Sequence, residues 1–92
     1  MKLIDFVKII TDVDDELIIF QENKEDFNSD IILSYGKDGD NGIKINGNKK
    51  YYYLIEVFLA KEFVQDWIQS LDFIPNEGQI AKRLFKYALN DA

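Results

Sequence analysis

This chain of 92 residues lacks two of the residue types on which enzyme chemistry most often depends. It contains no histidine and no cysteine, so the usual proton shuttle at neutral pH and the thiolate nucleophile are both absent. Among the reactive groups that remain are 17 carboxylates and five tyrosines. Catalysis by carboxylates needs burial or a specific partner that shifts the pKa, and nearly all of these carboxylates lie in polar stretches. We therefore expect a protein that is not an enzyme and carries no cofactor.

The carboxylates are concentrated in the first part of the chain. Residues 1–40 hold eleven Asp and Glu against four Lys, whereas residues 41–92 hold six against seven Lys and Arg, which gives a net charge of −6. Such an asymmetry favours a basic partner and disfavours direct binding to nucleic acid or to an anionic membrane. Negative charge also keeps a small protein soluble. A binding rim and a purely solubilising role therefore both stay open.

Aromatic residues near these acids are the predicted anchors for a partner. Phe27 is the only apolar residue of the stretch 22–30, and Tyr51 and Tyr53 share one face of a predicted strand. Tyrosines that the core does not use are typical interface residues, so core packing and partner contact are alternatives here. The predicted partner-binding residues are Asp12, Asp14, Asp15, Glu16, Glu22, Glu25, Asp26, Phe27, Asp30, Asp38, Asp40, Tyr51 and Tyr53.

Established site motifs do not fit the sequence. Read as an EF-hand loop from Asp38, the obligatory glycine position would be Ile43, and no phosphate-binding loop or nucleophile-elbow motif is present. The acids at 12–15 leave a weak divalent-cation site open as an alternative. Glu56 stands inside an apolar run, where an unpaired carboxylate is costly. Pairing with a cation, exposure, a partner contact and catalysis are its alternative roles.

Hydrophobic periodicity predicts an α+β protein. The expected architecture is a small antiparallel sheet of three to four strands with one N-terminal helix and two C-terminal helices. The strongest strand signal is the run of aromatic and β-branched residues at 51–59, which is apolar on both faces and therefore expected to be central. The predicted helices cover 2–11, 60–71 and the residues after Pro75, and the predicted strands cover 16–21, 30–35 and 51–59.

Residues 36–50 hold four of the five glycines and two Asn-Gly pairs. Asn-Gly favours hairpin turns, so a short strand at 43–45 and a flexible loop are alternative interpretations. The whole chain, residues 1–92, is expected to form one domain. A cytoplasmic location is expected because cysteine is absent, the opening residues do not resemble a signal peptide, and no apolar run approaches about 20 residues.

Two stretches, MKLIDFVKII at the start and YYYLIEVFLAKEFVQDWI at 51–68, resemble those of small bacterial proteins. With its size, acidity and α+β pattern, the chain resembles the immunity proteins of bacterial toxin–immunity systems, such as contact-dependent growth inhibition. That resemblance implies a protein that binds a cognate toxin, for instance a nuclease, and covers its basic active site. Three other functions remain open: an inhibitor from a phage or plasmid that mimics nucleic-acid charge, a homodimer, and a metal-dependent module built on carboxylates.

Overall fold

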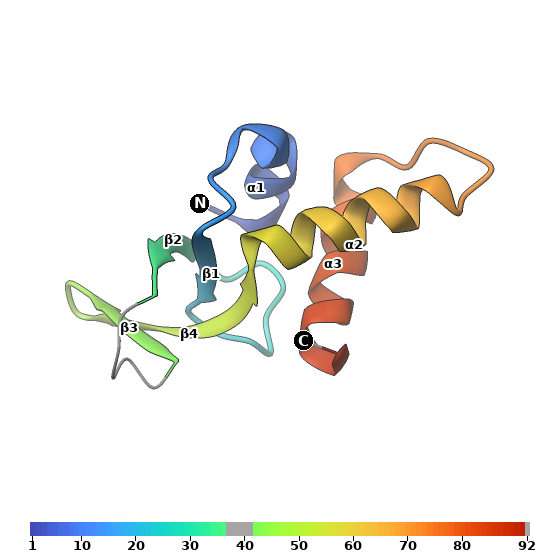
Figure 1. The fold of residues 1–92 in the computed structure, drawn as a ribbon. Helices are drawn as coiled ribbons and strands as arrows, with labels where there is room; N and C mark the ends of the chain where they lie inside the picture. Colours follow the sequence, from blue (N-terminus) through green and yellow to red (C-terminus); the bar gives the residue numbers. More distant parts are fainter. Residues whose placement is uncertain (37–41, 92) are drawn as a thin grey trace.

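The computed structural model describes residues 1–36 and 42–91 (Figure 1). The predicted α+β class is confirmed, with one N-terminal helix, two C-terminal helices and a four-stranded antiparallel sheet of order β2-β1-β4-β3. The elements are α1 (Leu3–Ile9), a 3₁₀ turn η1 (Ile10–Asp12), β1 (Leu17–Gln21), β2 (Ile31–Tyr35), β3 (Ile43–Asn46), β4 (Lys49–Glu56), α2 (Val57–Gln69) and α3 (Glu77–Asp91).

The strand β4 is central, as its sequence predicts, and pairs with β1 on one side and β3 on the other. Its pairing with β1 shifts by one residue, because Ile19 faces Ile55 whereas Phe20 faces Tyr53. Leu54 is the extra residue, and Leu54 and Ile55 are both buried although they are consecutive. This bulge interrupts the two-residue alternation that a regular strand would keep.

The predicted strand over 51–59 is wrong at its C-terminal end. The strand stops at Glu56 and the helix α2 begins directly at Val57, three residues earlier than predicted. Val57, Ala60 and Val64 are buried at helical spacing, so packing of the first helical turn on the sheet outweighs the strand preference of these residues. A short apolar run fits either structure by periodicity alone.

The main core lies between the sheet and the three helices. Figure 1 shows the helices grouped beside β1 and the C-terminal end of β4, while the hairpin of β3 and β4 extends away from them. α1 packs on α3, and both α2 and α3 contact the sheet. The buried residues of this core are Leu3, Phe6, Val7, Val13, Ile19, Ile31, Leu54, Ile55, Val57, Ala60, Val64, Ala81, Leu84 and Ala88.

A second group of side chains is buried outside that core. Phe20 is only 2% exposed, meets the ring of Tyr53 edge to face at 6.4 Å, and has the Lys44 ammonium 5.8 Å from its ring centre. Lys44 belongs to the β3–β4 hairpin, whose turn places Gly47 at φ 65°. The hairpin alternative is therefore confirmed for residues 43–50, and residues 37–41 lie outside the described part of the chain.

Asp30 joins three segments at the start of β2. Its carboxylate accepts hydrogen bonds from the Met1 ammonium at 2.7 Å and from the Tyr51 hydroxyl at 2.9 Å, while the Ile31 amide donates to the Met1 carbonyl at 2.7 Å. The ammonium lowers the pKa of Asp30 below its ordinary 3.8. The hydrogen bond to Asp30 raises the pKa of Tyr51 above its ordinary 10.0. Ionised Asp30 and neutral Tyr51 are thus the forms that the fold stabilises.

Replacing Phe20 by alanine should lower the free energy of unfolding by about 3–5 kcal/mol, because a buried ring that packs beside Tyr53 and Lys44 is lost. Phe58→Ala is the matched control: Phe58 is 44% exposed, and its loss should cost less than about 1 kcal/mol. Urea unfolding followed by circular dichroism measures both. Equal losses in the two variants would contradict the burial of Phe20.

Replacing Asp30 by asparagine should lower the free energy of unfolding at pH 7 by about 1 kcal/mol, since a hydrogen-bonded charge is removed. The stabilisation by Asp30 is present above its unfolded pKa and is lost as the pH falls through the lower folded value. The variant should therefore show a flatter acid limb than the parent in urea unfolding between pH 7 and pH 2. Glu25→Gln, at an exposed position, is the control and should keep the parent's acid limb.

Candidate protein-binding face

Two acidic connections flank β1, the first at residues 12–16 and the second at residues 22–30. They do not lie together. One precedes β1 and the other follows it, so they leave from opposite ends of a five-residue strand, about 17 Å apart at the usual rise per residue. Figure 1 shows the first connection beside α1 and the second beyond the other end of β1. The predicted acidic residues therefore form two separate groups, and Asp38 and Asp40 lie outside the described residues.

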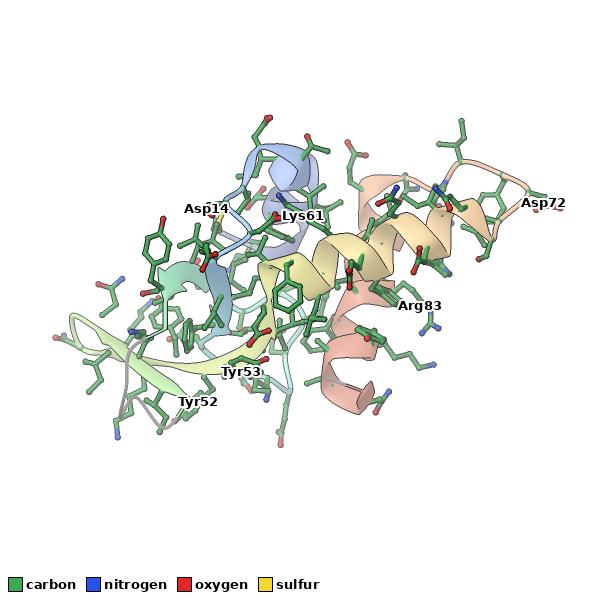
Figure 2. All side chains as sticks on the ribbon, viewed as in Figure 1. Asp14, Tyr52, Tyr53, Lys61, Asp72 and Arg83 are labelled. Atoms are coloured by element: carbon green, nitrogen blue, oxygen red, sulfur yellow. The ribbon has the colours of Figure 1, made fainter. Side chains whose placement is uncertain are left out.

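Several acids of the first connection already have partners within the chain. Asp14 accepts a hydrogen bond from the Glu16 amide at 2.9 Å and one from the Tyr35 hydroxyl at 2.8 Å, and these bonds lower the pKa of Asp14. Asp15 pairs at 2.6 Å with Lys61, which also donates to the Val13 carbonyl. In Figure 2, Lys61 reaches from α2 to the connection that carries Asp14. Asp12 and Glu16 are exposed and form no ion pair with any described residue.

Most residues of the second connection also contact other parts of the chain. Phe27 packs edge to face on Phe85 at 5.6 Å, on the border of the core. Buried Gln21 donates to the carbonyls of Asp26 and Phe27. The remaining predicted residues are placed as follows: Glu22 lies 3.8 Å from Lys49, Asp26 accepts the Asn28 amide at 2.9 Å, Asp30 holds Met1 and Tyr51, Glu25 is exposed, Tyr51 is buried, and Tyr53 is half-buried.

A different acidic surface forms along α2. Val57, Ala60 and Val64 turn one side of this helix into the core, so residues four apart on the other side, Phe58, Glu62 and Asp66, remain exposed. Glu56 at the end of β4 and Glu16 at the start of β1 adjoin this row through a shared hollow. We call these five residues the acidic α2 face.

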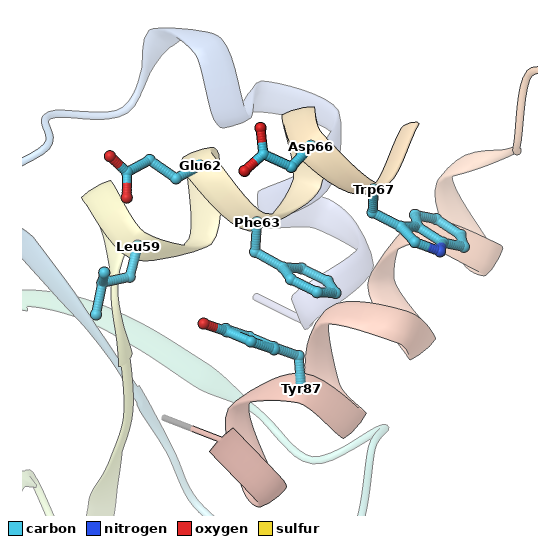
Figure 3. Close-up of a pocket in the computed structure, with 6 residues that line it drawn as sticks. All are labelled: Leu59, Glu62, Phe63, Asp66, Trp67 and Tyr87. Carbon is cyan, nitrogen blue, oxygen red and sulfur yellow. The ribbon is translucent and has the colours of Figure 1, made fainter. Parts of the chain in front are cut away.

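Two hollows open on this face. The β1–α2 hollow, of about 350 Å³, is lined by Asp15, Glu16, Leu17, Ile18, Glu56 and Phe58. The α2–α3 hollow, of about 340 Å³, is lined by Leu59, Glu62, Phe63, Asp66, Trp67 and Tyr87 (Figure 3). Both place carboxylates beside apolar or aromatic side chains. Aromatic side chains are enriched in protein interfaces, and the carboxylates would complement a basic partner.

The carboxylates of the acidic α2 face have no ion-pair partner in the part of the chain that the structure describes. Within residues 1–36 and 42–90, Glu16, Glu56, Glu62 and Asp66 form no ion pair. Burial raises the pKa of Tyr53 above its ordinary 10.0, and the negative charge of Glu56 raises it further. Of the roles predicted for Glu56, pairing with a cation is not seen among the described residues, and exposure, a partner contact and catalysis stay open.

Sequence reasoning missed most of this face. The sequence predicts Glu16 as a partner-binding residue, but Phe58 falls within the strand predicted at 51–59, and Glu62 and Asp66 fall within the helix predicted at 60–71 without a binding role. The available signal was the i, i+4 spacing of these two acids beside Phe63 and Trp67, which places charge and aromatic rings on adjacent positions of one helix.

No group of three or more carboxylates among the described residues is arranged to hold a metal ion. In the same part of the chain, none of the helices has the length and apolar character needed to cross a membrane. No protein family, curated protein or solved structure matches the chain. The candidate binding face is therefore argued from the geometry of this chain alone.

Neutralising the acidic pair should not weaken the fold. Like charges four residues apart on a helix repel, so Glu62→Gln/Asp66→Asn should leave the free energy of unfolding unchanged or raise it by about 0.2–0.5 kcal/mol, measured by urea denaturation. A loss above about 1 kcal/mol would show that the two carboxylates serve the fold and not a partner.

Proposed function

We propose that this chain is a non-catalytic protein-binding module that uses the acidic α2 face to hold a basic partner. The observation that carries the proposal is the row of unpaired carboxylates beside two hollows with aromatic or apolar walls. Unpaired like charges on one surface disfavour folding slightly and favour association with an opposite charge. The aromatic side chains provide the desolvated contacts from which affinity arises.

The partner that we propose is a bacterial toxin, with this chain as its immunity protein. Support for that role comes from the resemblance in size, acidity and α+β pattern described above. A toxin that acts on nucleic acid is basic where it holds phosphate, so a surface of this charge complements its active site. Binding there would block the toxin without any chemistry on the part of this chain.

A growth experiment tests the immunity role. Expression of the protein encoded by the neighbouring gene should arrest growth, and co-expression of this chain should restore it. If the neighbouring product is harmless, or if co-expression leaves growth arrested, the immunity role is overturned. A phage operon around the gene would instead favour the inhibitor that mimics nucleic-acid charge.

Charge reversal tests the binding face itself. Glu62→Lys/Asp66→Lys should slow association with the toxin at least 10-fold at low salt, because electrostatic steering contributes about 10- to 1,000-fold to association rates. The control, Glu25→Lys/Asp72→Lys, makes the same change in net charge at exposed positions away from the two hollows, and should slow association less than about 2-fold. Surface plasmon resonance at two salt concentrations measures the rates. Equal slowing by both variants would show that only net charge matters.

A further inference from the structure

We propose that the α2–α3 hollow binds an arginine side chain of the partner, with the guanidinium against the aromatic rings and paired with Glu62 and Asp66. The inference rests on the proposed function and specifies the anchor of that interface. The proposed function depends on the charge of the surface, whereas this inference depends on the shape and aromatic lining of one hollow.

The walls of the hollow come from two helices. Phe63 and Trp67 lie four residues apart on α2, and Tyr87 faces them from α3 (Figure 3). Glu62 and Asp66 line the same hollow as these rings. Leu59 lines the hollow as well. A cation that enters would meet aromatic surface and two carboxylates together.

The aromatic wall is already ordered. The rings of Phe63 and Tyr87 stack at 4.0 Å with an angle of 13° between their planes, so a ligand would not have to organise them. The chain's own Arg83 lies 5.5 Å from the centre of the Phe63 ring without lining the hollow. The contact is a cation–π interaction within the chain. Because Arg83 and Tyr87 both lie against the Phe63 ring, a guanidinium of the partner would use the Trp67 and Tyr87 rings.

The lining favours arginine over other occupants. An apolar side chain would leave two carboxylates to be desolvated without a partner. A divalent metal ion prefers about six or more oxygen ligands, and the hollow offers only two carboxylates. Lysine offers a compact charge, whereas the planar guanidinium both stacks on rings and forms paired hydrogen bonds with carboxylates. A volume of about 340 Å³ is at the lower end of ligand pockets, which suits one side chain.

Trp67 makes the hollow directly observable, because it is the only tryptophan of the chain. Titration of the intact chain with a hexa-arginine peptide should give a saturable change in Trp67 fluorescence. A hexa-lysine peptide of equal charge should bind at least 5-fold more weakly. Equal affinities for the two peptides, or an arginine titration without any Trp67 response, would overturn the proposal.

Two double variants locate the binding. Glu62→Gln/Asp66→Asn should weaken binding of the arginine peptide at least 10-fold, whereas Glu25→Gln/Asp72→Asn should change it less than 2-fold. Circular dichroism and urea unfolding confirm that both variants fold. If the first pair has no larger effect than the second, the peptide binds elsewhere and the proposal is overturned.

The two proposals fail separately. A toxin that binds through the acidic α2 face while the arginine peptide leaves Trp67 unchanged would remove the arginine anchor and keep the proposed function. Arginine-selective binding at Trp67 in a chain that protects against no toxin would keep the anchor and remove the immunity role.

Discussion

The direct passage from β4 into α2 is the constraint on which the rest of the arrangement depends. Glu56 ends the strand with extended backbone, and Val57 already belongs to the helix, so no loop lets α2 rotate or shift. Because Val57 and Ala60 must enter the core, Phe58, Glu62 and Asp66 must face outward. The same passage fixes Glu56 beside the start of β1, where its carboxylate joins the others. The continuous segment formed by β4 and α2 thus determines which side chains enter the core and which face outward on α2.

Most of the fold follows from sequence periodicity. The three helices, the strands β1, β2 and β4, and the central position of β4 were all predicted, because their apolar residues recur at clear helical or strand spacing. Residues 57–59 were misassigned because β-branched and aromatic side chains fit a strand locally, while the helix is selected by packing of Val57, Ala60 and Val64 on the sheet. The bulge at Leu54 could not be predicted from periodicity either, because it depends on how β1 pairs with β4.

The acidic α2 face, which we propose as the binding surface, was predictable only in part. Connections that flank one strand leave from its opposite ends, so the separation of the two acidic groups was already implied by the predicted strand. Which acids are used internally could not be deduced, because Lys61, Tyr35 and Met1 reach Asp15, Asp14 and Asp30 only in the folded chain. Counting charge along the sequence therefore overestimated the acids available to a partner in both connections and overlooked those on α2.

Carboxylate labelling with and without the bound toxin tests the central claim most directly. Carbodiimide coupling followed by mass spectrometry reports the accessibility of each Asp and Glu in the same sample. We expect Glu56, Glu62 and Asp66 to lose most of their labelling in the complex, while exposed Glu25 and Asp72 keep theirs. Protection of Glu25 or Asp72 with unchanged labelling of Glu62 and Asp66 would contradict the assignment of α2 as the binding face.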